Sequence, residues 1–426
     1  MRLILPLLLL FVTTPVVRAQ DPAVDSARTA RSAWASAVRA IREGDTTAAR
    51  VQVDRAASAW PTQPYYRWQQ ILLAARAHDT ALVRAKLLAF TRMELSADLE
   101  DSALSEFRER PWFAHVRSLN AANASPIVRS EAFAILRTPT IWPEGVDVDV
   151  SSGTVYVSSI RHRTIMEFKA GHVERPLWPL DSGPGAVLAV RRAPSGDALW
   201  VTIAGLPQMR GFHPSDSGTA ALLKVRIADG AILRRIDLPP GKHVPGDLAV
   251  TRAGDIYVSD SHEPVLYRLA AGSDRLEAIR SPLFRSLQGI AIDPSGRVFL
   301  ADYSHGLLRL DPATGEVIRI ADAPHSTALG CDGIAWHNGA IIAIQNGFAP
   351  ARIMRFRLNG AADSVATAEV IDRNSALADE PTLGVVIGDD LYYVANSQWE
   401  KYTAAGVLRP GVILSPPVIL RLRLKL

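Results

Sequence analysis

The chain has 426 residues, of which 47 are Lys or Arg and 43 are Asp or Glu, and its formal net charge is +4. Hydrophobic residues make up 48% of the sequence, which excludes a disordered chain and suffices for a large core. The basic residues are spread among the acidic ones and form no basic block, so the composition argues against a nucleic-acid partner.

Residues 1–19 are predicted to be a signal peptide. Arg2 supplies a charged start, residues 3–12 are apolar, and Val17 and Ala19 match a small-residue cleavage site. The apolar run is too short to cross a bilayer, and no later stretch predicts a membrane span. We therefore expect a periplasmic or secreted protein. Cys331 is the only cysteine, so an intrachain disulfide is impossible.

Residues 25–122 are rich in Ala, Arg and Leu, with apolar residues three and four apart, which predicts a helical domain. Trp34 and Trp68 are 34 residues apart, as are Asp45 and Asp79. The small residues and the helix-ending proline of a tetratricopeptide unit are matched by Gly44, Ala49, Ala56 and Pro61. The segment resembles two degenerate tetratricopeptide repeats. It is expected to pack against the rest of the chain or to offer a groove to a protein partner.

Residues 127–426 change to short alternating strands separated by glycine turns, typical of a mainly β fold. A Pro-Ser-Gly turn joins two strands within residues 289–302. Equivalent glycine turns recur at Gly153, Gly196, Gly254, Gly296, Gly339 and Gly388. A four-stranded unit that recurs every 40–50 residues or so is a propeller blade. We predict a six-bladed β-propeller preceded by a small all-α domain.

The last predicted blade has only three strands, the third at residues 418–424. The early strand at residues 131–136 is expected to complete it and so remove an open edge. Two inserted loops, residues 205–220 and 397–416, follow second strands and carry large aromatic side chains, including Trp399 and Tyr402. We expect these loops to wall the mouth of the central channel; the alternative is that they pack on the helical domain.

Polar residues occupy the entrances of four predicted inner strands. Glu144, Asp247 and Asp332 open blades 1, 3 and 5, and Gln288 holds the matching place in blade 4. Carboxylate and amide oxygens at one level of a channel suit a hard cation, with Ca²⁺ preferred. The alternative for each residue is that it caps a local turn. Four further residues end second strands and are interpreted as turn formers: Asp260, Asp302, Asn346 and Asn396.

Three blade-opening motifs, Pro143-Glu144-Gly145, Leu287-Gln288-Gly289 and Cys331-Asp332-Gly333, resemble those of the senescence marker protein/gluconolactonase/luciferin-regenerating-enzyme family, to which the paraoxonases are related. The resemblance covers about residues 140–426. It implies a six-bladed propeller that opens lactones or cleaves esters with a divalent cation, Ca²⁺ or Zn²⁺, in its channel. It also implies a metal-binding role for Glu144 and a metal-binding and acid–base role for Asp332.

Two positions depart from that family. Gln288 stands where the family usually has Asn, and Gly246 stands where it has Asn before the aspartate of blade 3. Non-enzymatic propellers of the NHL type share the Gly-Ile-Ala-Ile-Asp-Pro-Ser-Gly pattern that begins at residue 289. These departures leave two functions open.

The first function is an exported, metal-dependent lactonase or esterase acting on a small molecule in the channel. The metal would polarise the carbonyl, and Asp332, His243 or His325 would move the proton. The sequence has no Gly-x-Ser-x-Gly motif, so a serine-hydrolase triad is not supported. The second function is a non-catalytic, NHL-like propeller that binds a ligand, peptide or glycan.

Overall fold

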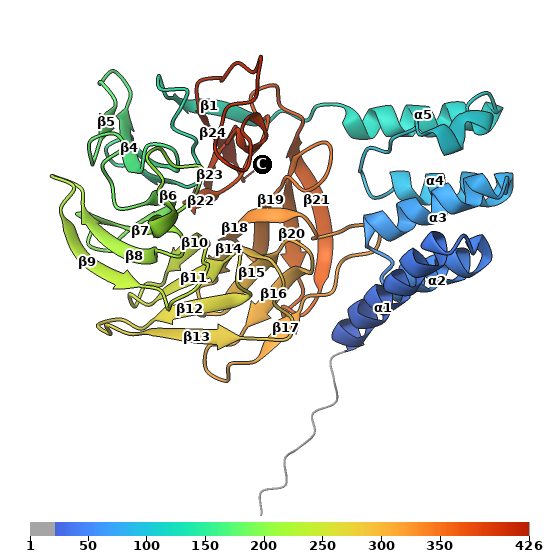
Figure 1. The fold of residues 1–426 in the computed structure, drawn as a ribbon, viewed down its shortest axis with the longest axis horizontal. Helices are drawn as coiled ribbons and strands as arrows, with labels where there is room; N and C mark the ends of the chain where they lie inside the picture. Colours follow the sequence, from blue (N-terminus) through green and yellow to red (C-terminus); the bar gives the residue numbers. More distant parts are fainter. Residues whose placement is uncertain (1–21, 426) are drawn as a thin grey trace, which may run out of the picture.

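The computed structural model describes residues 22–425, so the predicted signal peptide lies outside the described part. Six antiparallel four-stranded sheets surround one axis, and a group of helices lies beside them (Figure 1). The prediction of a mainly β, six-bladed propeller with helices before it is confirmed. Among residues 22–425, no helix is both long enough and apolar enough to cross a bilayer.

The blades follow chain order, and the first strand of each lies nearest the axis, in contact with the first strands of its neighbours. Blade 1 has strands β2 (Val146–Asp149), β3 (Thr154–Ser159), β4 (Thr164–Lys169) and β5 (Arg175–Pro176). Blade 2 has β6 (Ala186–Arg192), β7 (Ala198–Ala204), β8 (Ala220–Arg226) and β9 (Ile232–Asp237). Blade 3 has β10 (Pro245–Val250), β11 (Ile256–Asp260), β12 (Val265–Leu269) and β13 (Leu276–Arg280).

Blade 4 has β14 (Leu287–Ile292), β15 (Val298–Asp302), β16 (Gly306–Leu310) and β17 (Val317–Arg319). Blade 5 has β18 (Cys331–His337), β19 (Ala340–Gln345), β20 (Arg352–Leu358) and β21 (Val365–Arg373). Blade 6 has β22 (Gly384–Ile387), β23 (Asp390–Val394), β24 (Val418–Arg423) and, at its outer edge, β1 (Ser130–Ile135).

Strand β1 closes the ring as predicted. It pairs antiparallel with β24, with Glu131 opposite Arg421 and Ala134 opposite Ile419. The first strand of the propeller therefore belongs to its last blade. Buried apolar side chains fill the space between neighbouring sheets, for example Val148 of blade 1 against Val394 of blade 6.

Each α-helix of the N-terminal segment packs on the α-helix before it, and the short 3₁₀ helix packs on α3. The helices are α1 (Pro22–Arg42), α2 (Thr46–Ala59), α3 (Pro64–Arg76), α4 (Thr80–Thr91), the short 3₁₀ helix η1 (Ser102–Phe107) and α5 (Pro111–Ala124). The recurring aspartates of the sequence have a physical role here. Asp45 caps α2 by accepting the Ala48 N–H, and Asp79 caps α4 by accepting the Leu82 N–H. The tetratricopeptide assignment itself stays a prediction.

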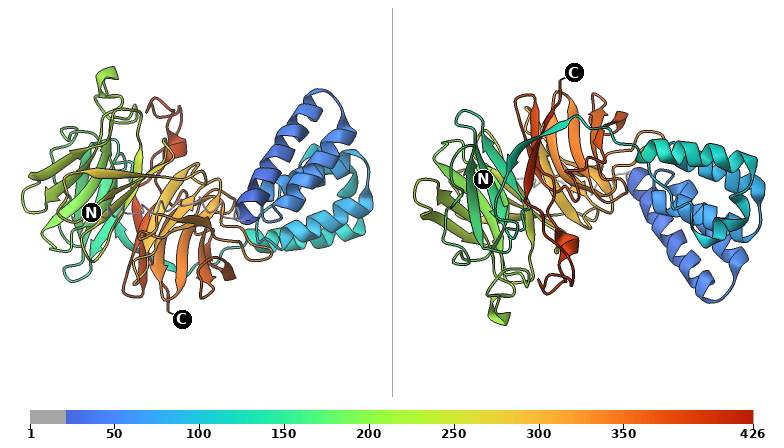
Figure 2. Two further views of the ribbon diagram at one scale, coloured as in Figure 1. Left: turned by 90° about the horizontal axis from the view of Figure 1, so that it is seen from below. Right: turned by 90° about the horizontal axis from the view of Figure 1, so that it is seen from above.

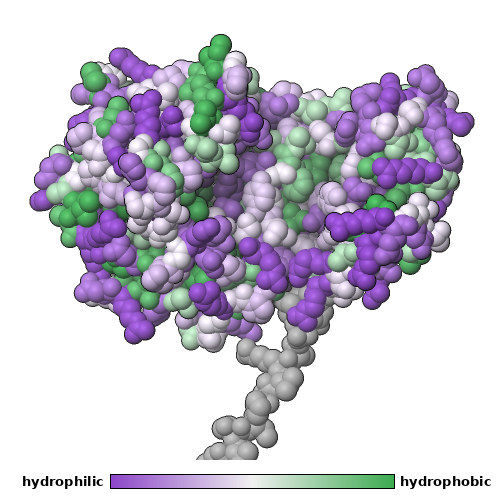
Figure 3. Space-filling view, viewed as in Figure 1, coloured by the Kyte–Doolittle hydropathy of each residue, from purple (hydrophilic) through white to green (hydrophobic). Residues whose placement is uncertain are grey.

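The helical segment docks on blades 4 and 5 (Figure 2). The Trp60 ring stacks on His305, with centroids 5.9 Å apart, and the Arg319 guanidinium lies 4.8 Å from the Trp60 ring centre. The Arg31 guanidinium of α1 bonds Nε2 of the same histidine. Buried Arg352 of β20 donates to the carbonyls of Met93 and Glu94. The space-filling view shows the molecule hollowed between propeller and helices (Figure 3).

Candidate functional site

Glycines behind three of the predicted site residues explain how the inner strands approach one another. An ideal Cβ at any of these glycines would collide with backbone of the next blade, so no larger residue fits. The distance from that Cβ to the nearest backbone oxygen is 2.7 Å at Gly145, 2.5 Å at Gly289 and 2.7 Å at Gly333. At Gly289 that oxygen belongs to Asp332. The Gln288-Gly289 pair of blade 4 therefore positions the backbone of the blade 5 aspartate.

Glu144 and Asp332 interact electrostatically at the entrance of the inner strands. Burial is the main cause that raises the pKa of the Asp332 carboxyl to about 7, and the charges of Asp247 and Glu380 add to it. Burial also raises the pKa of Glu144 well above its ordinary range, followed by repulsion from Asp332. Because the charge of each carboxyl disfavours ionisation of the other, the two groups titrate as an interacting pair.

Each carboxyl is held by one side-chain donor from a neighbouring loop. The indole Nε1–H of Trp399 donates to Oε2 of Glu144 at 2.6 Å, and Nδ2 of Asn346 donates to Oδ2 of Asp332 at 2.8 Å. Both bonds favour the charged form and lower the pKa of their carboxyl, against the effect of burial. Asn346 in turn accepts from the Tyr303 hydroxyl at 3.1 Å. Burial raises the pKa of that phenol to about 12, so it remains a donor at neutral pH.

A polar cavity of about 360 Å³ lies on the other side of Asn346 from Asp332, and neither Glu144 nor Asp332 lines it. Asn346 belongs to its wall and at the same time bonds Asp332, which connects the cavity to the carboxyl. The remaining walls are formed by Tyr303, Ala351, Asp379, Glu380, Glu400, Lys401 and Val412. A small polar ligand in this space would contact Asn346 and the carboxyl of Glu380, whose pKa is raised by burial.

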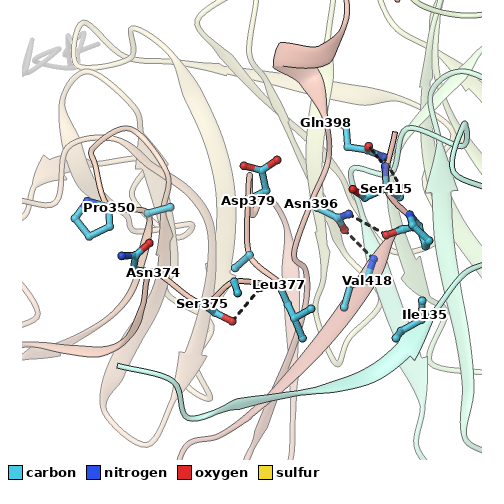
Figure 4. A pocket seen from close by; sticks show the side chains of 14 residues that line it. Ile135, Pro350, Asn374, Ser375, Leu377, Asp379, Asn396, Gln398, Ser415 and Val418 are labelled. Atoms are coloured by element: carbon cyan, nitrogen blue, oxygen red, sulfur yellow. Dashed lines mark hydrogen bonds between the residues drawn. The ribbon is translucent and has the colours of Figure 1, made fainter. Parts of the chain in front are cut away.

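A larger cavity of about 590 Å³ lies between the segment at residues 374–379 and the ends of the loop before β24 (Figure 4). The amides that face it are already used to fix the loop. Asn396 bonds the backbone of Pro416 and Val418, and Gln398 bonds the backbone of Ser415. We take the smaller cavity as the candidate ligand site, because its wall contains Glu380, whose pKa burial raises, and Asn346, which bonds Asp332.

The two inserted loops contact each other and the entrance of blade 1, and their role as a wall of the channel mouth stays a prediction. Trp142 stacks on Tyr402 with centroids 4.1 Å apart, and Trp399 packs edge-on against Trp142 at 4.9 Å. Gln208 of the first loop donates to the carbonyl of Ala404 in the second loop. Trp399 thus packs in an aromatic cluster and bonds a site carboxyl.

Asp247, which was predicted as a metal ligand, is instead paired with an arginine. Its Oδ1 lies 3.1 Å from Nη2 of Arg191, and its Oδ2 accepts the backbone N–H of Ile290 at 3.0 Å. Both oxygens therefore have donors already. Burial raises the pKa of Asp247, and the charge of Arg191 is the largest opposing cause.

The predicted four-residue cation site therefore does not fit this arrangement. Gln288 turns its Oε1 toward the hydroxyl of Ser261 at 3.2 Å. Within residues 22–425, no three His, Cys, Asp or Glu side chains are grouped as metal ligands. Because Asp247 is paired with Arg191, Glu144 and Asp332 are the predicted ligands whose carboxyls have no arginine or lysine partner among the described residues. Dependence on Ca²⁺ or Zn²⁺ remains a prediction without support from the side-chain geometry.

The two histidines predicted to move a proton have other surroundings. Nδ1 of His243 lies 2.5 Å from Oδ2 of buried Asp260, and its ring packs edge-on against Tyr267, all within blade 3 or the loop entering it. His325 is exposed, on backbone with a φ of 59°. Neither contributes to the charges that act on Glu144 or Asp332. A catalytic role for either histidine stays a prediction that their contacts do not support.

Sequence reasoning missed Asn346, Arg191 and Glu380 as members of this region. The turn-former interpretation is confirmed for Asp260 and Asp302, which accept backbone N–H groups of the following loops. For Asn346 it is not borne out, because its Nδ2 donates to Asp332 and to the carbonyl of Pro381 in the segment before blade 6. The available signal for Arg191 was a cation directly after the apolar run at residues 186–190.

No protein-family model matches the chain, and no curated protein matches it. Solved structures with a similar fold include a gluconolactonase from Xanthomonas campestris, 14% identical, covering 72% of this chain and 93% of that one with a TM-score of 0.48. Virginiamycin B lyase from Staphylococcus aureus is 15% identical over 63% and 82% of the two chains, with a TM-score of 0.44. These similarities are too low to carry an argument about activity.

Proposed function

We propose that the protein is a hydrolase that cleaves small esters or lactones by acid–base catalysis at Glu144 and Asp332. The observation that carries the proposal is the buried pair of carboxyls with raised pKa, connected through Asn346 to a polar cavity. Two interacting carboxyls can keep one member ionised while the other is protonated, which supplies a general base and a general acid.

The reaction assigns one role to each protonation state of the pair. The ionised carboxyl takes a proton from a water molecule while the water oxygen bonds to the carbonyl carbon of the substrate. The protonated carboxyl then gives its proton to the leaving oxygen as the carbon–oxygen bond breaks. The products are a carboxylic acid and an alcohol, or one hydroxy acid from a lactone. The cavity of about 360 Å³ limits the substrate to a small molecule.

The sequence favours export of the protein, whereas the side-chain geometry does not favour dependence on a metal ion. The predicted signal peptide at residues 1–19 favours action in the periplasm or outside the cell. The pairing of Asp247 with Arg191 disfavours the predicted cation set, so no step of the proposed reaction passes through a metal ion.

A binding-only propeller is the second candidate. The hydrogen bonds from Trp399 to Glu144 and from Asn346 to Asp332 favour it, because they fix both carboxyls as acceptors for a bound ligand. In that case the acids would recognise donor groups of the ligand without turning it over.

The test uses the mature protein with a panel of small lactones and short-chain aryl esters. The hydrolase proposal expects turnover by the wild type, and a loss of about 100-fold or more in kcat for Asp332→Asn and Glu144→Gln. Glu167→Gln, on the outer part of blade 1, is the control and should keep full activity. Absence of turnover together with ligand binding that weakens in Asp332→Asn would replace the hydrolase by the binding function.

A further inference from the structure

We infer that Arg191 is a built-in cation of the propeller channel, which neutralises Asp247 and ties the blades together where related channels are expected to hold a metal ion. Arg191 lies near the end of β6, after a register shift between Val187 and Val190. Its side chain is 11% exposed and that of Asp247 is 1% exposed. The ion pair is therefore almost entirely removed from water.

The guanidinium donates to groups from four blades. Nη1 donates to the carbonyls of Val146 in blade 1 and Val190 in blade 2. Nη2 donates to the carbonyl of Gly384 in blade 6 and to the carboxylate of Asp247 in blade 3. Since no side chain can contact both blade 6 and blade 3 from blade 2 without crossing the centre of the ring, Arg191 lies across the channel.

Asp247 extends the connection to a further blade, because its other oxygen accepts the N–H of Ile290 in blade 4. One ion pair thus joins blades 1, 2, 3, 4 and 6. A planar guanidinium with several fixed N–H groups suits such a set of carbonyl and carboxylate acceptors, whereas an ammonium does not. The pair supplies the charge neutralisation and the cross-linking for which a channel would otherwise need a divalent ion.

This arrangement predicts how stability responds to cations. The wild-type propeller should not need Ca²⁺ to fold, since Asp247 already has its counter-charge. Loss of the arginine should leave a buried carboxylate without a partner, which is strongly destabilising. The freed carboxylate, close enough to affect the pKa of Glu144 and Asp332, should then give the variant a new affinity for divalent cations.

The experiment measures Tm in chelator and in millimolar CaCl₂ for the wild type, Arg191→Met, Arg191→Lys and the double variant Arg191→Met/Asp247→Asn. Arg192→Met is the control, because Arg192 is the next residue but pairs with Asp149 away from this contact. We expect the wild-type Tm to be the same in both buffers, and Arg191→Met to lose about 6 °C or more. Adding Asp247→Asn should restore part of the loss, and CaCl₂ should stabilise Arg191→Met alone.

Two results would overturn the inference. One is a wild-type Tm that drops by several degrees in chelator, which would show that a bound metal ion supports the channel. The other is an Arg191→Met Tm no lower than that of Arg192→Met. If Arg191→Met does not fold, the inference is tested by the Tm of Arg191→Lys against that of Arg192→Met. The Tm of the wild type in chelator tests it as well. All of these measurements are Tm values, so their interpretation does not depend on whether the protein is a hydrolase.

Discussion

The indole nitrogen of Trp399 lies 2.6 Å from Oε2 of Glu144, although 255 residues separate the two in the chain. The bond joins the inserted loop of blade 6 to the entrance of blade 1. Because it stabilises the ionised carboxylate, it lowers the pKa of Glu144 against the effect of burial and of Asp332. The inserted loop therefore influences the protonation of the carboxyl pair as well as the shape of the channel mouth.

Trp399→Phe should separate these two effects. Phenylalanine keeps a ring against Trp142 but lacks the N–H, so the pKa of Glu144 should rise further while Tm falls by only about 2–4 °C. The limb of the kcat/KM–pH profile that reports this carboxyl should move to higher pH, measured on any substrate that the panel identifies.

Trp399→Ala is the matched comparison, because it also removes the ring contacts with Trp142. It should cost about 2–3 kcal/mol of stability, less than a fully buried aromatic side chain, because Trp399 is only partly buried. An unchanged pH profile in Trp399→Phe would show that the hydrogen bond does not tune the pair.

Asp332→Asn should change how stability depends on pH. The folded state raises the pKa of Asp332 from 3.8 to about 7, so between these values the folded protein binds more protons than the unfolded one. The contribution of Asp332 to stability therefore falls as pH rises through this window and is constant above it, with a slope of at most about 1.4 kcal/mol per pH unit. Urea unfolding at several pH values should show that the free energy of unfolding of Asp332→Asn increases relative to that of the wild type as pH rises from about 4 to about 7. A parallel dependence for both proteins would contradict the raised pKa.

Gly289→Ala tests whether close approach of neighbouring blades positions the aspartate. The added Cβ would lie 2.5 Å from the carbonyl oxygen of Asp332, so one of the two strands must move. We expect a stability loss of about 1–3 kcal/mol, typical of overpacking, together with a disproportionate loss of activity or ligand binding. Gly360→Ala is the control, since nothing lies within 4 Å of its Cβ position. Equal behaviour of the two variants would refute the positioning role.

Acid should weaken the contact between helices and propeller at His305. Burial, followed among the lowering causes by the charges of Arg31 and Arg285, lowers the pKa of His305 to about 4, although Asp302 opposes this. The unfolded state binds more protons between pH 4 and 6.5, so the stabilisation is lost as pH falls through this range. Protonated Nε2 can no longer accept from Arg31.

The protection of the α1 amides against hydrogen exchange, corrected for the pH dependence of the intrinsic rate, should therefore decrease between about pH 7 and pH 5. In His305→Gln, whose side chain does not titrate, this loss of protection with falling pH should disappear. A His305→Gln profile identical to that of the wild type would assign the acid response to other groups.

The propeller could be predicted because its signals are local. Each hairpin turn carries a glycine, and the spacing of these turns gives the blade count directly. The missing strand of the last blade then predicts the pairing of β1 with β24, which the register confirms. The motif glycines at 145, 289 and 333 were also visible, and the structure explains them by the close approach of neighbouring blades.

The side-chain partners of the site could not be predicted, because they depend on the tertiary arrangement. Arg191 and Asp247 are 56 residues apart in the chain, and their pairing follows only from the direction of two long side chains at the centre of the ring. From the sequence, a carboxylate at a blade entrance is predicted to be a cation ligand whether or not an arginine is already paired with it in the fold. The same limit applies to Asn346, whose partner Asp332 belongs to the adjacent inner strand.

The pairing of β1 with β24 also sets an order of events during synthesis. The ribosome releases β1 before any other strand of the propeller, yet its only strand partner is the last one to emerge. Until β24 has emerged, β1 has no strand to pair with, so its backbone N–H and C=O groups lack their partners in the sheet. A chain in this state offers an open β edge, so the yield of native protein should depend on keeping that edge apart from other chains until the last strand of the propeller arrives.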